Sequence, residues 1–222
     1  MNEYSFILWH DSAMSATVKN LKRTATREKR RQQLIDSTMK CIARKGMGSL
    51  TLGDVASEAG LSQGIVNLHF RSKDNLLNET LRYLSDEYKM QFDRALKKSG
   101  PGAADKLHAL MELDLRPSIC DQRKIAVWFA FWGEVKSRPK YREICETSDE
   151  YYDDVTESLC DELIKDGSYE GVSSTAVSTV LTSMTNGLWL SYLISPKSFD
   201  RQQAMQAIDE YLSSIFPKHF PL

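Results

Sequence analysis

The segment from Thr51 to Phe70 reads TLGDVASEAGLSQGIVNLHF, and it has the spacing of two short helices joined by a tight turn. Thr51 and Asp54 have N-cap and N3 character for the first helix, and Ser62 can satisfy the free amides that open the second. Gly60 can take the positive φ angle that such a turn requires. The segment therefore predicts a helix–turn–helix unit.

The two predicted helices each have an inner and an outer side. Val55 and Ala56 face inward on the first helix, while Ile65, Val66 and Phe70 pack the second helix against it. This pattern leaves four residues on the outer side of the second helix: Gln63, Gly64, Asn67 and His69.

The outer residues suit contact with a DNA duplex. The amides of Gln63 and Asn67 offer a donor and an acceptor together, which matches the major-groove edge of adenine. Gly64 removes a side chain where a helix N-terminus must approach a phosphate or a base closely. Thr51 and Lys73, each at the start of a flanking helix, are placed for phosphate contacts, which set register without reading sequence.

A purely structural explanation of these positions is also open: Gln63 and Asn67 could form an ordinary solvated face, and His69 could be a packing residue. The charge distribution favours DNA. Residues 1–78 carry a formal charge of +5 and residues 79–222 carry −6, within a net charge of −1. A basic end on an acidic body indicates a polyanionic partner at that end. The basic residues concentrate before the motif, at Lys19, Lys22, Arg23, Arg27, Lys29, Arg30, Arg31, Lys40, Arg44 and Lys45.

The rest of the chain also has helical patterns, bounded by caps, glycines and prolines. The predicted class is all-α with about nine helices, comprising an N-terminal three-helix helix–turn–helix DNA-binding domain and a larger C-terminal helical domain for ligand binding and dimerisation. Outside the motif, helices are expected from residue 26 to Gly46, from Lys73 to Gly100, and over 103–115, 121–137, 140–165, 173–195 and 200–216.

Three parts are expected along the chain: a disordered extension over residues 1–25, the DNA-binding domain over 26–78, and the ligand-binding and dimerisation domain over 79–222. Met14 could be the genuine start of the protein. Lys19, Lys22 and Arg23 could act as an arm in the DNA minor groove or have no role.

Composition disfavours several other classes of protein. The four cysteines form no CxxC pair, the four histidines are isolated, and neither a phosphate loop nor a Gly-x-Ser-x-Gly motif is present. We therefore expect no metal site, no cofactor and no catalysis. The most apolar stretch, 179–194, is too short to cross a bilayer and the N-terminus lacks a secretion signal, so a cytoplasmic protein is expected.

The motif and the segment after it, TLGDVASEAGLSQGIVNLHFRSKDNLL, resemble the DNA-binding domain of the TetR family of transcriptional regulators, over roughly Thr26 to Leu81. AVWFAFWGEVKSRPKYREI (126–144) and NGLWLSYLISPKSFDRQQA (186–204) resemble its choline-responsive, BetI-like branch. The resemblance implies a homodimer, a C-terminal ligand pocket, and release of operator DNA when ligand binds. By position, Thr51, Gln63, Gly64, Asn67, His69 and Lys73 inherit DNA-contact roles. Asn67 stands where the family commonly has tyrosine, which puts the base preference there in question.

Several aromatic residues could hold the effector. Rings that converge from different helices can form a cage for a quaternary ammonium group, and a nearby acid such as Glu134 or Asp114 could balance its charge. Core packing is the competing explanation, and an unrelated apolar metabolite or drug is the competing ligand. The residues proposed for ligand binding are Trp128, Phe131, Trp132, Trp189 and Tyr192, with Tyr151 and Tyr152 as further candidates.

Dimerisation is expected to use the last two helices, which would form a four-helix interface between two subunits. Ser178, Thr182, Ser183 and Gly187 allow close approach of helices, and an apolar face follows at Ala204, Ala207, Ile208, Leu212 and Ile215. The function expected is that of a ligand-responsive regulator, a repressor that binds a palindromic operator as a dimer. The alternative is an architectural DNA-binding dimer without a small-molecule ligand.

Overall fold

The computed structural model describes residues 26–221. The extension predicted over residues 1–25, with its alternative start and its basic arm, lies outside these residues. Within the described part, all regular secondary structure is helical and amounts to nine helices without a strand. The prediction of an all-α fold with about nine helices is therefore confirmed.

The helix boundaries follow from caps and prolines. Thr51, Ser72, Asp121, Ser173 and Asp200 each occupy an N-cap whose side chain accepts a backbone N–H from the first turn. The helices, after a first one over residues 26–45, are α2 (Leu52–Glu58), α3 (Gln63–Phe70), α4 (Lys73–Lys98), α5 (Ala103–Leu115), α6 (Gln122–Trp132), α7 (Pro139–Gly167), α8 (Ser174–Ile194) and α9 (Arg201–Ile215).

One boundary differs from the prediction. The helix expected over 121–137 ends at Trp132, and Gly133 is its C-cap. Glycine is a poor helix former, and Pro139 disfavours the helical conformation at the residue before it. The backbone between them closes into short turns, with the N–H of Glu134 donating to Phe131 O at 3.0 Å. These turns bring α7 back beside α4.

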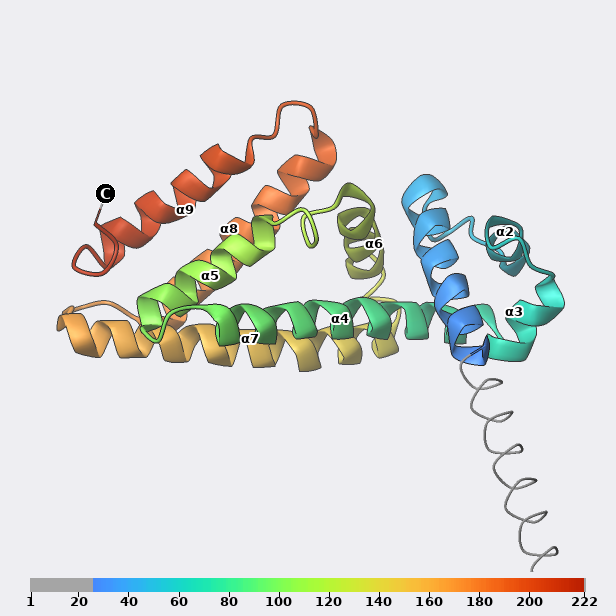
Figure 1. The fold of residues 1–222 in the computed structure, drawn as a ribbon, viewed down its shortest axis with the longest axis horizontal. Helices are drawn as coiled ribbons and strands as arrows, with labels where there is room; N and C mark the ends of the chain where they lie inside the picture. Colours follow the sequence, from blue (N-terminus) through green and yellow to red (C-terminus); the bar gives the residue numbers. More distant parts are fainter. Residues whose placement is uncertain (1–25, 222) are drawn as a thin grey trace, which may run out of the picture.

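The first helix, α2 and α3 form a head at one end of the molecule (Figure 1). Its core contains Leu34, Val55 and Phe70, all almost fully buried. The same core continues into α4 at Leu81 and reaches Phe131 of α6. The predicted domain boundary at residue 78 thus falls inside one continuous helix that belongs to both ends of the molecule.

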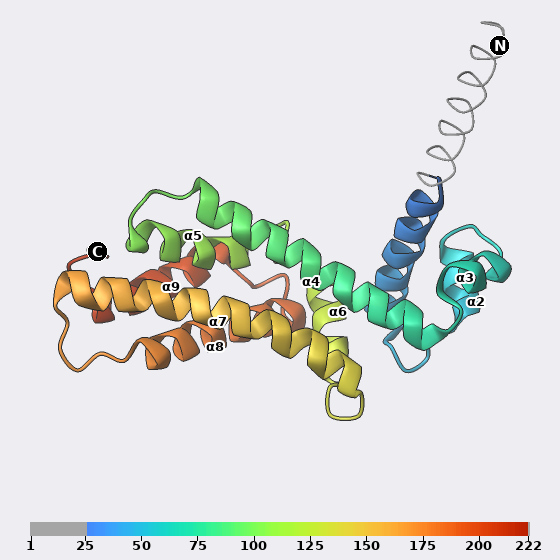
Figure 2. The ribbon, with the colours of Figure 1, turned by 90° about the horizontal axis from the view of Figure 1, so that it is seen from below.

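Helices α4 and α7 run side by side along the long axis (Figures 1 and 2). Helix α5 packs against both of them, α8 packs against α7, and α9 packs against α5 and α8. A second core fills this body and includes Leu107, Leu163, Leu181 and Ile208. No helix in the part of the chain that the structure describes has the length and apolar character needed to cross a membrane.

Candidate functional site

The outer surface of α3 carries exposed residues from both of its turns. Gln63, Gly64 and Asn67 are exposed, while Val66 and Phe70 are buried against the head. Gly60 has a φ of 63°, as the turn before α3 was predicted to require. The side chain of Ser62, in contrast to the prediction, makes no capping hydrogen bond, although the residue does occupy the N-cap.

Thr51 and Asp54 close a capping box at the start of α2, as predicted. The amide of Thr51 donates to Asp54 Oδ2 at 2.8 Å, and the amide of Asp54 donates to Thr51 Oγ1 at 3.2 Å. The Lys45 ammonium and the Thr51 groups hold the pKa of the Asp54 carboxyl well below its usual range. The Thr51 hydroxyl therefore has a structural partner inside the head, even though the residue is exposed.

His69 and Lys73 lie at the edges of the α3 surface and are half-buried. The Lys73 ammonium donates to the Met47 carbonyl at 3.4 Å. Burial, followed by the charge of Arg27, lowers the pKa of His69, so its ring is neutral near pH 7.

The basic residues of the first helix fall into two groups. Those in its second half are engaged within the head: Arg44 pairs with Glu58 at 2.9 Å, and Lys45 pairs with Asp54 at 2.5 Å. At its start, Arg27, Lys29 and Arg30 are exposed. The free positive charge of this helix is thus concentrated at the end nearest to His69.

Two exposed residues, one on α3 and one directly after it, lie beside the predicted set without belonging to it. Leu68 is 73% exposed on α3. Arg71, directly after α3, is exposed with a φ of 63°. The spacing of the buried residues of α3 already implies that position 68 faces outward. A leucine at this position is not a signal for a binding site in a sequence, because leucine is usually a core residue.

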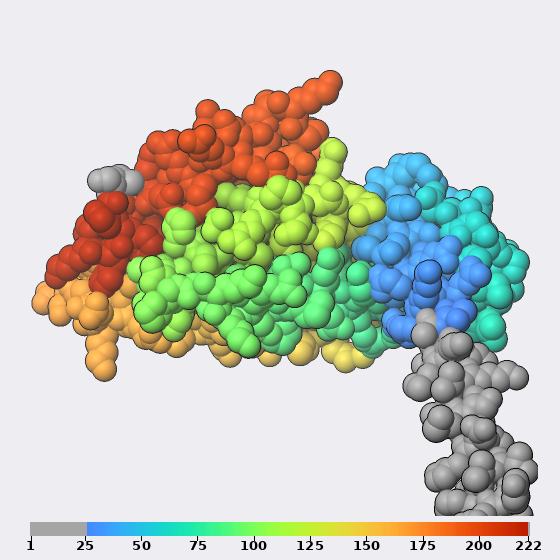
Figure 3. Space-filling model, in the orientation of Figure 1, coloured from blue at the N-terminus to red at the C-terminus, as the bar shows by residue number. Residues whose placement is uncertain are grey.

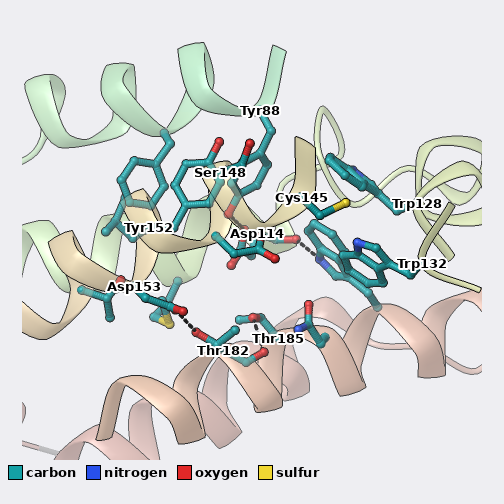
Figure 4. A pocket seen from close by; sticks show the side chains of 17 residues that line it. Tyr88, Asp114, Trp128, Trp132, Cys145, Ser148, Tyr152, Asp153, Thr182 and Thr185 are labelled. Atoms are coloured by element: carbon teal, nitrogen blue, oxygen red, sulfur yellow. Dashed lines mark hydrogen bonds between the residues drawn. The ribbon is translucent and has the colours of Figure 1, made fainter. Parts of the chain in front are cut away.

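A cavity of about 370 Å³ lies in the body, enclosed by α4, α5, α6, α7 and α8 (Figure 4). Six of its lining residues are aromatic, and three are aspartates, of which Asp114 lies among the rings. The aromatic lining residues are Tyr88, Phe92, Trp128, Trp132, Tyr152 and Trp189.

The rings form two groups within this cavity. The rings of Trp132 and Trp189 are nearly parallel, at 8°, with centroids 6.4 Å apart, and Trp128 adjoins Trp132 at 5.7 Å. Tyr88 and Tyr152 meet edge to face at 4.9 Å. In Figure 4, Asp114 lies between the two tyrosines and Trp132. Aromatic faces around an anionic centre are the arrangement that attracts an organic cation.

Asp114 is buried and is held by groups from two other helices. The Tyr88 hydroxyl of α4 donates to Asp114 Oδ1 at 2.6 Å, and Trp189 Nε1 of α8 donates to the Asp114 carbonyl at 2.7 Å. Burial raises the pKa of the Asp114 carboxyl to about 7, against the opposing effect of the hydrogen bonds from Tyr88 and Thr185. A cation inside the cavity would stabilise the ionised form.

Further carboxylates lie on α7 beside the same cavity. Asp149 and Asp153 belong to its lining, and the Thr182 hydroxyl of α8 donates to Asp153 Oδ1 at 3.3 Å. Desolvation, and then the charges of Asp153 and Glu146, raise the pKa of Asp149 to about 6. Among the described residues that line the cavity there is no lysine, arginine or histidine. The cavity therefore favours positive charge.

The structure brings together some of the residues proposed for ligand binding and separates others. Trp128, Trp132 and Trp189 line the cavity, as does Asp114. Phe131 instead packs on Tyr141 in the core shared with the head, with centroids 5.0 Å apart.

Other candidates lie outside the cavity as well. Tyr192 packs on Phe199, at 5.2 Å between centroids, and the Arg201 guanidinium lies over its ring. Glu134 accepts a hydrogen bond from Ser137, and Tyr151 donates to Asp93. Neither Glu134 nor Tyr151 is among the lining residues of the aromatic cavity.

Tyr88 lines the cavity but was not identified from the sequence. Its only signal there is the spacing of four residues from Phe92, which gives both rings the same face of α4. That spacing is common in helices that merely pack, so it could not single out Tyr88.

The exposed side of α8 carries large apolar residues. Val180, Leu190 and Ile194 are 39%, 41% and 71% exposed. Of the apolar face predicted for the last helix, Ala204, Ile208 and Leu212 are buried in the core of the protomer, whereas Ala207 is exposed. Helix α9 lies at the surface of the body, where it is coloured red in Figure 3. The exposed large hydrophobic residues of these two helices belong to α8.

Comparison with known proteins gives consistent matches. A family model described as "BetI-type transcriptional repressor, C-terminal" matches residues 103–217, and one described as "Bacterial regulatory proteins, tetR family" matches residues 34–80. The HTH-type transcriptional regulator BetI of Yersinia pestis (strain Pestoides F) is 30% identical over 186 residues, which cover 82% of this chain and 90% of that protein.

Two solved structures have the same fold. A putative transcriptional regulator from Pseudomonas aeruginosa PAO1 aligns with a TM-score of 0.76 and 24% identity, over 87% of this chain and 94% of its own. A putative transcriptional regulator from Saccharomonospora viridis in complex with choline aligns with a TM-score of 0.73 and 24% identity, over 84% and 96% of the two chains.

Proposed function

Because this chain belongs to the TetR family of transcriptional regulators and has a C-terminal domain of the BetI type, we propose that it is a ligand-responsive repressor. It binds a palindromic operator as a homodimer, in the cytoplasm, and it leaves the operator when a small organic cation fills the aromatic cavity. The effector is choline or another quaternary ammonium compound.

The DNA-binding half of the proposal rests on α3. Gln63, Gly64 and Asn67 are exposed together on one side of a helix that can enter the major groove. Arg27, Lys29 and Arg30 supply exposed positive charge from the first helix, which suits phosphate contacts. Thr51, His69 and Lys73 are proposed for the flanking contacts.

The effector half is carried by one observation: a cavity that is lined by six aromatic side chains and whose charged lining groups are all carboxylates. A quaternary ammonium group has no proton to donate, so it is held by aromatic faces and by nearby negative charge. Trp132, Trp189, Tyr88 and Asp114 provide both. The choline complex of the Saccharomonospora viridis regulator supports the same class of ligand.

The proposed mechanism is a population shift between two arrangements of the dimer. In one arrangement the two α3 helices match successive turns of the major groove, at about 34–36 Å. The effector favours the other arrangement, and the coupling between effector binding and DNA binding is reciprocal. Such coupling free energies are typically about 1–3 kcal/mol, or roughly 5–150-fold in affinity. Helix α4 connects the two sites, since it follows α3 directly and contributes Tyr88 to the cavity.

The experiment is fluorescence anisotropy with the DNA directly upstream of the gene for this protein, at fixed salt, with and without choline. Tight binding that choline weakens supports the proposal. Tight binding that choline leaves unchanged would keep the regulator and contradict choline as its effector. Binding no tighter than to a random duplex would show that this DNA contains no operator, and selection from random duplexes would then decide whether the protein reads sequence at all.

A further inference from the structure

Leu68 lies in the middle of the outer face of α3, where it is 73% exposed. Building on the DNA-binding function proposed above, we infer that Leu68 reads a base: its side chain packs on the 5-methyl group of a thymine in the major groove of each half-site. This assigns a specificity role to a residue outside the polar set of Gln63, Gly64 and Asn67.

The helical geometry places Leu68 opposite the core. Val66 and Phe70 are buried and mark the inner side of α3. At about 100° per residue, position 68 points away from both, and position 64 lies one turn before it on the same side. The outermost line of α3 therefore consists of Gly64 and Leu68, with Gln63 and Asn67 beside them.

Among residues 26–221, no neighbour covers the large apolar side chain at this place. The exposed large hydrophobic residues of the described chain are Leu68, Met90, Val180, Leu190 and Ile194, and three of them belong to α8. Leu68 is the most exposed of these and the one that lies in the head. A partner that contacts the outer face of α3 would remove this surface from water.

The neighbouring residues allow that partner to be a base edge. A Cβ added at Gly64 would meet only Ser62 Oγ, at 3.7 Å, so the first turn of α3 is bare and can lie deep in a groove. Thymine is the base that presents an apolar group, its C5-methyl, on the major-groove edge. The amides of Gln63 and Asn67 suit adenine, so the outer face as a whole fits A·T pairs.

The test uses the full-length protein and the duplex obtained by selection from random sequences. Each thymine of the selected half-site is replaced in turn by deoxyuridine, which removes the methyl group and leaves the pairing edge and O4 in place. Affinities for each duplex are measured by anisotropy for the wild type, for Leu68→Ala and for Asn67→Ala. Because Leu68 is exposed, the substitution is expected to leave the thermal melting temperature unchanged, and this is measured first.

The wild type is expected to lose about fourfold in affinity at one thymine, the effect of one methyl-sized apolar group, and about 15-fold when both half-sites are substituted. Leu68→Ala should bind the thymine and uracil duplexes equally, whereas Asn67→Ala should keep the preference for thymine. Equal binding of both duplexes by the wild type, or an undiminished preference in Leu68→Ala, would overturn the inference. A selection that enriches no sequence would instead overturn the proposed function itself, and the inference with it.

Discussion

A side chain added at Gly64 meets only Ser62 Oγ among the residues that the structure describes, and Gly64 is not among the glycines with positive φ. Folding therefore does not require glycine at this position, and we propose that close approach of α3 to DNA does. We expect Gly64→Ala to weaken operator binding by about tenfold or more, since a displaced helix strains several contacts at once. The free energy of unfolding should change by less than about 1 kcal/mol, in the direction of higher stability.

Anisotropy and urea unfolding measure the two quantities separately. Gln206→Ala, an exposed change on α9, serves as the control that should alter neither. Unchanged operator affinity in Gly64→Ala would mean that α3 does not approach the duplex at this residue.

The pKa of Asp114 predicts a pH dependence of effector binding. Burial raises this pKa to about 7, so the carboxyl is mostly protonated at pH 6 and mostly ionised at pH 8. Choline carries a fixed charge and prefers the ionised form. Its dissociation constant should therefore be about tenfold lower at pH 8 than at pH 6. Isothermal titration calorimetry at the two pH values measures this ratio.

Asp114→Asn should bind choline more weakly at pH 8 and should lose most of the dependence on pH. A smaller remaining dependence in the same direction is expected from Asp149, whose pKa is raised to about 6. The stability of the ligand-free protein depends on pH in the opposite direction. The buried Asp114 carboxyl favours folding in its protonated form, and this contribution to stability is lost as pH rises through 7. An unaltered pH profile in Asp114→Asn would remove Asp114 from the effector site.

Helix α4 connects the head to the cavity, and the hydrogen bond from Tyr88 to Asp114 joins α4 to α5. A cation beside Asp114 competes for the carboxylate that Tyr88 binds, so occupation of the cavity changes what α4 can contact. We expect Tyr88→Phe to keep operator binding without choline within about threefold, but to reduce the weakening that choline causes in the wild type.

The matched control is Tyr151→Phe, which removes another hydrogen bond between a tyrosine and an aspartate, from α7 to Asp93 of α4, outside the aromatic cavity. This variant should respond to choline like the wild type. If Tyr88→Phe also responded fully while binding choline normally, the coupling would have to use another route than this hydrogen bond.

Some helix boundaries could be predicted from the sequence and others could not. The starts of α4, α8 and α9 were predictable because a capping side chain and the adjacent apolar period are local signals. The end of α6 was not, since Gly133 outweighs an apolar pattern that continues past it. Residues that face a cavity are still harder to predict from the sequence. Phe131 and Trp132 are neighbours in sequence, but one is in the core and the other lines the cavity, which only the packing of α6 against α7 and α8 decides.

For the whole molecule, the exposed side of α8 contains Val180, Ser183, Gly187, Leu190 and Ile194, at alternating intervals of three and four residues. That period forms a straight seam along a helix, and the small residues in its middle permit close contact with a second copy. Because Ala204, Ile208 and Leu212 of α9 are used inside the protomer, we propose α8 as the main dimer surface, with α9 at its margin.

Leu190→Asp places a charge in the middle of this seam and should yield a folded monomer. A monomer contacts one half-site only, so operator affinity should fall by about 100-fold or more through the loss of bivalent binding. Sedimentation velocity and circular dichroism measure the assembly and the fold. Met90→Asp is the control, because Met90 is 62% exposed on α4 and lies off the seam, and this variant should remain dimeric.

The assembly state and the operator affinity of Leu190→Asp test two separate parts of the proposal. A variant that stays dimeric would place the interface elsewhere on the molecule. A variant that becomes monomeric but binds the operator as tightly as the wild type would show that one head is sufficient. In that case the spacing of the two α3 helices could not be what the effector changes. Only the loss of both properties together is consistent with a repressor that reads a palindrome through a dimer held by α8.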